Sequence, residues 1–154
     1  MHAVLFAGVL EALGLDPTYG AYLDRLPGIT LATVNLMSLF GLHRRWRGAL
    51  VGHLAGFEMT SVSPMSRYAE TVDRLGLPSS ARRFYAVHVA ADAHHQVVAA
   101  DGLIGGLAEG EPELVADILF GVRALMAVEG RFTEHLLRAW ASGRSSLRPT
   151  ISAR

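Results

Sequence analysis

The sequence predicts an all-α protein, and two features of its pattern carry the prediction. Apolar residues recur at intervals of three and four along nearly the whole chain, whereas the strict alternation that is typical of strands is almost absent. Glycine and proline interrupt this pattern at places suited to helix ends. The length of 154 residues and the 51% of hydrophobic residues suit one domain with a buried core.

Four helical segments are expected in the first part of the chain. Gly14 suits the C-terminus of the first segment, and Asp16 and Pro17 open a short second one. Gly41 separates the third segment from the fourth, and Ser61 to Pro64 is expected to be a loop. In order, these segments cover about residues 1–13, 16–26, 30–40 and 43–60.

Three further helices are expected in the rest of the chain. The first is short and ends at Gly76, and Ser79 or Ser80 caps the long helix that follows. The glycines of 102–106 predict a loose corner, and Pro112 suits the first turn of a last long helix. In order, these helices cover about residues 65–75, 79–100 and 112–140. The sequence thus predicts a helical domain over 1–142 and a polar tail over 143–154.

Composition argues against several classes of function. Lys and Arg number 14, and so do Asp and Glu, so the chain lacks the positive charge that binds nucleic acid or an anionic membrane. Cysteine is absent, which excludes disulfides, cysteine-based zinc sites and thiol nucleophiles. The longest apolar run, 29–42, is too short to cross a bilayer, and Glu11 interrupts the first apolar stretch. We therefore expect no signal peptide and a cytoplasmic protein.

The strongest local signal is the pattern His88-x-x-x-Asp92-x-x-His95. At about 100° per residue these three side chains share a narrow stripe of one helix face with apolar residues, while His94 lies on another side. Burying an ionised carboxylate is costly unless it is paired or binds a metal. The three groups can therefore pair with one another, or they can bind iron, manganese or zinc.

Three other ionisable residues fall on apolar helix faces. Glu58 shares its side of a helix with apolar residues, whereas His53 is expected to point elsewhere. His2 begins the apolar face of the first helix, and Glu129 lies in line with the apolar face of the last. Glu129 is a hydrogen-bond acceptor behind a metal ligand, a proton carrier or simply a buried acid. Close approach of another helix is expected along a ridge of small residues beside Glu58, formed by Gly48, Gly52 and Gly56.

Several helices thus each direct ligand-type side chains toward what is expected to be a common core. Helical bundles build carboxylate-bridged dimetal sites in this way, from inward Glu, Asp and His on facing helices. The sequence contains no glycine-rich phosphate loop, G-x-S-x-G elbow or H-E-x-x-H pattern that would favour another chemistry. A metal centre is therefore the leading interpretation.

These residues resemble the haem-oxygenase-like diiron oxidases and oxygenases, also known as iron-containing redox enzymes. The stretch GHLAGFE, which ends at Glu58, carries the resemblance together with the His88, Asp92 and His95 pattern. Segments over 1–6, 13–15, 34–38 and 117–121 are similar as well, so that the resemblance covers nearly the whole chain.

The resemblance implies a haem-oxygenase-like helical bundle with non-haem iron. It implies two ferrous ions in intact members, which activate O2 to oxidise a small organic substrate. It also implies a set of metal ligands, namely His2, Glu58, His88, Asp92 and His95.

The family has one more ligand, a Glu shortly before the position matched by His2, and no residue of this sequence precedes Met1. We therefore expect an N-terminally truncated chain or a site with fewer ligands and impaired activity. The absence of a capping residue before the first helix fits truncation. A missing helix would expose apolar surface, so homodimerisation or other self-association is expected.

Two alternatives stay open. One is a single metal ion held by His88, His95 and a carboxylate, in the manner of a facial triad. The other is a non-catalytic helical module that binds small molecules or dimerises, in which the buried His and Asp hydrogen-bond with each other. The expected partners of an enzyme are O2 and a small-molecule substrate, without nucleic acid or membrane.

Overall fold

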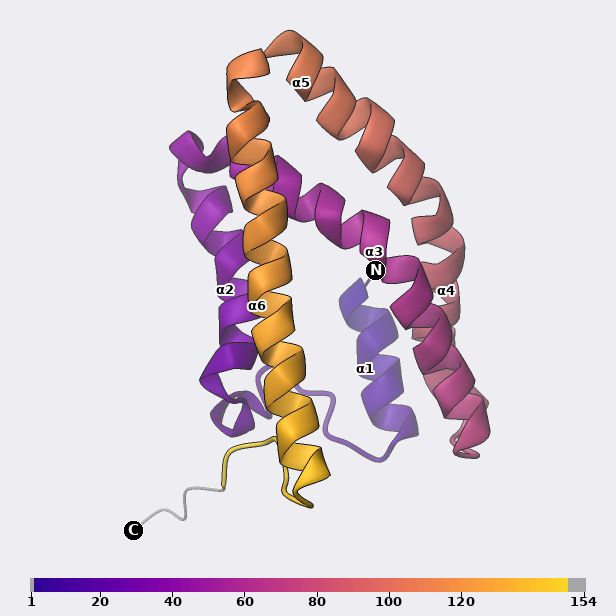
Figure 1. Ribbon diagram of the computed structural model, residues 1–154. Helices are drawn as coiled ribbons and strands as arrows, with labels where there is room; N and C mark the ends of the chain where they lie inside the picture. Colours follow the sequence, from indigo (N-terminus) through magenta and orange to yellow (C-terminus); the bar gives the residue numbers. More distant parts are fainter. Residues whose placement is uncertain (1, 150–154) are drawn as a thin grey trace. The chain divides into compact units, whose positions relative to one another are not determined.

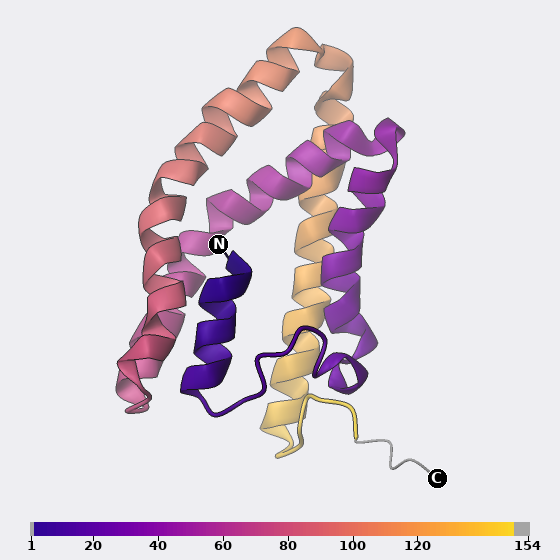
Figure 2. The ribbon, with the colours of Figure 1, turned by 180° about the vertical axis from the view of Figure 1, so that it is seen from behind.

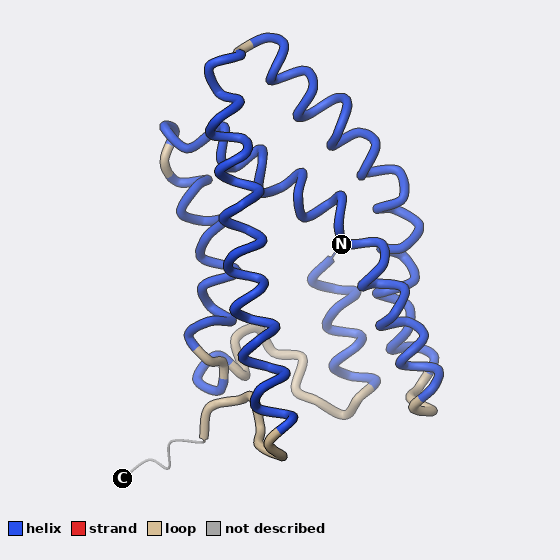
Figure 3. The backbone as a smooth tube through the Cα atoms, viewed as in Figure 1, coloured by secondary structure: helices blue, strands red, loops and turns tan. Residues whose placement is uncertain are grey.

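The computed structural model describes residues 2–149, and all regular structure within that range is helical (Figures 1 and 3). The α-helices are α1 (His2–Ala12), α2 (Gly28–Leu42), α3 (Arg47–Arg74), α4 (Ser79–Val97), α5 (Gly106–Gly110) and α6 (Val115–Ala141). Shorter elements are the 3-10 helices η1 (Leu23–Arg25), η2 (Arg44–Trp46) and η4 (Pro112–Leu114), and the π-helix η3 (Val98–Gly105). The all-α prediction is confirmed. None of the helices between residues 2 and 149 has the length and hydropathy that a membrane crossing requires.

The chain divides into two compact units. The first contains residues 1–21 and 57–102, and the second contains 22–56 and 103–154. Helix α3 contributes to both, since its residues up to Gly56 belong to the second unit and those from Phe57 onward to the first. The expected extent of the helical domain, 1–142, and of the tail, 143–154, stays a prediction.

In the first unit, α1 packs against α4, as Figure 2 shows from behind. Val9 of α1, Val72 of α3 and Ala81 of α4 form the buried core, and the rings of Phe84 and Tyr85 pack against it. Apolar residues at helical spacing thus bring these three helices together. The ligand-type residues of α3 and α4 are thereby held in one unit.

Two glycines end helices of this unit as the sequence predicts. Gly14 follows α1 with a φ of +70°, and Gly76 follows α3 with a φ of +64°. At each end, the N–H of the residue after the glycine donates to the carbonyl oxygen five residues earlier. The N–H of the glycine itself donates to the carbonyl oxygen three residues earlier. This pairing satisfies the last carbonyls of a helix and requires a left-handed residue, a conformation that glycine adopts without strain.

In the second unit, α2 packs against α6, and the first part of α3 crosses α6 at very close range. A Cβ atom added to Gly52 would lie 1.9 Å from the carbonyl oxygen of Ile118. One added to Gly121 would lie 2.0 Å from the carbonyl oxygen of Ala49. The predicted close approach along the small-residue ridge is therefore confirmed, with α6 as the helix that approaches.

The expected loop over Ser61 to Pro64 is wrong, because α3 continues through Pro64 to Arg74. Pro64 is exposed, so its ring is accommodated on the solvent side. The hydroxyl of Ser61 bonds the Asp92 carboxylate of α4, which ties this turn to the neighbouring helix. The helix thus continues here despite the low helix propensity of proline.

The expected corner at 102–106 is wrong as well. The chain stays helical there, first as η3 and then as α5, and Gly102, Gly105 and Gly106 all have negative φ. Glycine permits a turn without imposing one. The wide turns of η3 keep the backbone helical beyond the last residue of α4.

Two smaller expectations also fail. Within 16–26 only η1 is helical, because the Asp16 carboxylate accepts a hydrogen bond from the Thr18 N–H at 2.8 Å and so forms a local turn. At the start of α4, Pro78 occupies the cap position in an extended conformation, and no side chain caps the helix. Ser79 is instead the first residue of α4.

Candidate metal centre

Glu58 of α3 and Asp92 and His95 of α4 form the only group of potential metal ligands found within the described part of the chain. One ligand atom of each lies within 4.8 Å of the others. Glu58 Oε2 is 3.1 Å from His95 Nδ1, which is in turn 3.4 Å from Asp92 Oδ1. Residues 37 positions apart in the chain are thus brought together, as the helical spacing in α4 and the apolar side of Glu58 predict.

The three side chains differ in their access to solvent. Asp92 is 7% exposed, Glu58 28% and His95 48%. Asp92 therefore lies at the base of the group and His95 at its mouth. A buried carboxylate needs a partner or a cation, while the exposed imidazole leaves a path from solvent to the group.

Ser61 supports Asp92 from α3. Its hydroxyl lies 2.7 Å from Asp92 Oδ2 and donates a hydrogen bond to it. Sequence reasoning missed Ser61, because Pro64 suggested a loop at this position. Had the helix been extended through the proline, the spacing of three residues from Glu58 would have placed Ser61 on the same face.

His88 and His2 form a second pair next to this group. His88 is buried one turn before Asp92, and its Nδ1 donates a hydrogen bond to the carbonyl oxygen of Phe84 at 2.6 Å. This bond holds His88 in the tautomer with the proton on Nδ1. The lone pair on Nε2 is then free to bind a metal. The exposed His2 lies against it, with 4.8 Å between the ring centroids. Both residues lie outside the group of three, and their role as ligands stays a prediction.

A family model described as iron-containing redox enzyme matches residues 1–130. The chain belongs to this haem-oxygenase-like family. The comparisons with curated proteins and with solved structures gave no match.

The residues of this chain fit the metal after which its family is described. Two carboxylates and an imidazole supply the hard and borderline O and N donors that ferrous iron accepts. The two negative charges also suit a divalent cation, whose charge would offset their repulsion. Glu58, Asp92 and His95 are therefore the described residues best suited to hold iron.

Two other ionisable residues of the redox enzyme lie on the second unit. Burial raises the pKa of Glu129 on α6, and its participation in the metal centre stays a prediction. His53 on α3 is 4% exposed, its two ring nitrogens have no hydrogen-bond partner among residues 2–149, and burial lowers its pKa. Sequence reasoning placed His53 on a different side from Glu58 and did not predict that it is buried.

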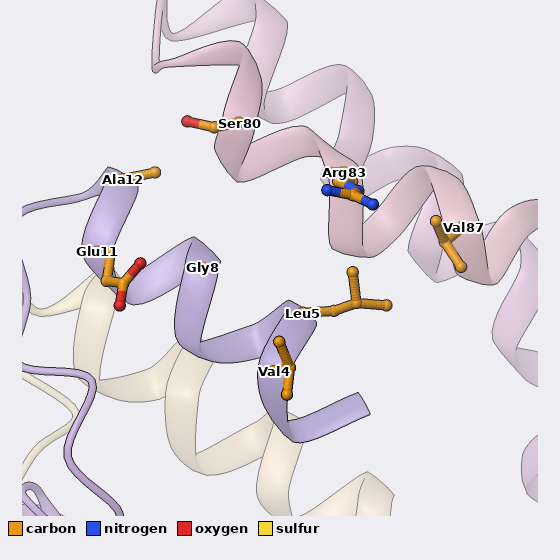
Figure 4. A pocket seen from close by; sticks show the side chains of 8 residues that line it. All are labelled: Val4, Leu5, Gly8, Glu11, Ala12, Ser80, Arg83 and Val87. Carbon is orange, nitrogen blue, oxygen red and sulfur yellow. The ribbon is translucent and has the colours of Figure 1, made fainter. Parts of the chain in front are cut away.

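A groove of about 730 Å³ lies between α1 and α4 in the first unit (Figure 4). Its walls are mostly apolar, with Glu11 and Arg83 as charged members. None of the five predicted ligands lines it, although Val87 in its wall is the residue before His88. The eight lining residues are Val4, Leu5, Gly8, Glu11, Ala12, Ser80, Arg83 and Val87.

Proposed function

We propose that this chain is a non-haem iron oxidoreductase that uses O2 to oxidise a small organic substrate. The observation that carries the proposal is the meeting of Glu58, Asp92 and His95 within 4.8 Å in a member of an iron-containing redox family. Two acids and an imidazole held together by separate helices are the arrangement from which helical bundles build iron sites.

The residues near such a centre have different roles. Bound ferrous iron supplies the single-electron chemistry by which O2 reacts with organic molecules. Glu58 and Asp92 supply negative charge, and His95 Nδ1, which faces both carboxylates, would hold the metal in its unprotonated form. The carbonyl of Phe84 fixes the tautomer of His88, and the Phe84 ring lies 4.2 Å from the imidazole and limits the access of water to it.

The groove between α1 and α4 supports the part of the proposal that concerns a small-molecule substrate. Its volume of about 730 Å³ lies within the usual range of ligand pockets, and its mostly apolar wall with a few polar groups is typical of them. It reaches Val87, next to His88, so that a substrate bound there lies along the helix that carries three of the predicted ligands. The residues of the site, and not the fold, determine which substrate binds.

The number of iron ions separates two forms of the proposal. The main form has two ions, with His88 and His2 completing the set of Glu58, Asp92 and His95. A one-ion form differs from the triad of His88, His95 and a carboxylate that the sequence suggests, because the group of Glu58, Asp92 and His95 would hold the ion alone. The observation that favours it is that His2 and His88 lie outside that group.

Iron analysis of protein loaded without O2 tests the proposal. The wild type is expected to retain two ferrous ions per chain, and Glu58→Ala is expected to lose iron because a carboxylate ligand is gone. Glu70→Ala, an exposed Glu on the same helix, is the matched control and is expected to bind iron as the wild type does. His88→Ala separates the two forms, because it lowers the iron content only if His88 is a ligand.

Reaction with O2 provides the second measurement. The loaded wild type is expected to consume O2 faster than loaded Glu58→Ala at equal protein concentration. A wild-type chain that retains no ferrous iron would contradict the proposal and favour the non-catalytic helical module.

A further inference from the structure

We propose that Ser61 is a positioning residue of the metal centre. Its hydroxyl fixes the rotation of the Asp92 carboxylate, so that Oδ1 faces His95 while Oδ2 is held by α3. This inference rests on the proposed function, because it assigns Ser61 a role in holding iron.

The geometry gives each oxygen of Asp92 a separate partner. Oδ2 accepts the Ser61 hydroxyl at 2.7 Å, and Oδ1 lies 3.4 Å from His95 Nδ1. A carboxylate held at one oxygen cannot rotate about its last bond without losing that bond. Ser61 therefore directs Oδ1 toward His95 Nδ1.

The Ser61 hydroxyl has a second neighbour, the carbonyl oxygen of Glu58 at 3.0 Å. A hydroxyl carries one proton, so it donates to one of the two acceptors at a time. The carboxylate is closer and charged, and hydrogen bonds to ionised acceptors are roughly twice as strong as neutral ones. Donation to Asp92 therefore prevails over the local bond that serine often makes within a helix.

Burial strengthens the hold of the Ser61 hydroxyl on the Asp92 carboxylate. Ser61 and Asp92 are both buried, so water does not readily replace the hydroxyl. The bond also joins α3 to α4, the two helices that supply the ligands. Partners of this kind, which hold a metal ligand from behind, typically change metal affinity by about 10–100-fold when they are removed.

The test compares Ser61→Thr with Ser61→Val in the full chain. Threonine and valine have nearly the same shape, and threonine alone keeps the hydroxyl. Titration with ferrous iron without O2 is expected to give an affinity near that of the wild type for Ser61→Thr and one about 10–100-fold lower for Ser61→Val. Ser66→Ala, which removes an exposed hydroxyl bond on the same helix, is expected to leave the affinity unchanged.

A purely structural role would lower the metal-free melting temperature of the valine variant without separating the two affinities. Equal affinities for the threonine and valine variants would overturn the role of Ser61 and leave the proposed function standing. No iron binding by the wild type would overturn both. Ser61→Ala repeats the comparison without added atoms, so the test does not depend on whether the core admits the larger pair.

Discussion

His53 shows at the scale of one residue how burial changes protonation. Its ring packs edge-on against Phe40, with 6.1 Å between centroids, and neither nitrogen finds a partner within residues 2–149. Burial disfavours the charged imidazolium and lowers the pKa of His53. The unfolded chain therefore binds a proton more readily than the folded one, and stability falls as the pH drops through the ordinary histidine pKa of about 6.5.

The variant His53→Leu removes this proton and the unpaired nitrogens. We expect it to raise the free energy of unfolding by about 1–3 kcal/mol, because a buried unsatisfied polar group costs that much. The melting temperature of metal-free wild type is expected to fall more steeply between pH 7 and pH 5 than that of the variant. Parallel pH profiles would show that His53 does not contribute to acid destabilisation.

Glu129 presents the opposite case of a partly buried acid. Burial raises its pKa, so the folded chain holds the proton more tightly than the unfolded one, and stability is lost as the pH rises through the shifted pKa. Glu129→Gln is therefore expected to have a higher melting temperature than wild type at pH 7, with the difference shrinking toward pH 4. The exposed Glu109→Gln is the control. A lower melting temperature of Glu129→Gln at pH 7 would contradict this account.

At this scale the sequence predicted part of the candidate site. The helical period of α4 placed Asp92 and His95 on one face, and the structure brings Glu58 to them. Ser61 was missed because proline indicates a break, and its hydrogen-bond partner is a residue 31 positions away. Local pattern alone does not report a contact of that kind.

At the scale of the helix, the crossing of α3 and α6 depends on glycine. Gly52→Ala would place a Cβ atom 1.9 Å from the Ile118 carbonyl oxygen, and the contact atom belongs to backbone that cannot turn aside. We expect a loss of at least about 1–3 kcal/mol in the free energy of unfolding, measured by denaturant titration.

Gly130→Ala is the matched control for this crossing. Gly130 lies inside α6, the helix that α3 crosses, but a Cβ atom there meets nothing within 4 Å. Alanine favours the helix over glycine by about 0.5–1 kcal/mol, so this variant is expected to gain stability. Equal effects of the two substitutions would mean that the close crossing does not limit what position 52 accepts.

Helix ends were predictable where glycine has to be left-handed and unpredictable where it does not. Gly14 and Gly76 end helices as expected, because their positive φ completes the hydrogen bonding of the last turn. Gly102 and Gly105 are also glycines, but they lie within a helix that continues. The sequence does not distinguish these cases, since glycine adopts either conformation at little cost.

At the scale of the whole molecule, the periodicity of apolar residues was enough to predict the all-α class. It did not predict that the chain forms two compact units, between which it passes after residues 21, 56 and 102. The unbroken apolar pattern of a long helix gives no sign of where its contacts change from one unit to the other. All five predicted ligands belong to the unit of residues 1–21 and 57–102, so the candidate centre lies within one unit.

The central claim is that the folded chain binds ferrous iron through Glu58, Asp92 and His95, and thermal unfolding tests it most directly. A ligand that binds only the folded state at 100 times its Kd adds about 2.7 kcal/mol of stability. For a chain of this size that corresponds to a rise of roughly 5–10 °C in the melting temperature. We expect this rise for the wild type with ferrous iron under anaerobic conditions and no rise for Asp92→Asn. An unchanged wild-type melting temperature at saturating iron would contradict the account.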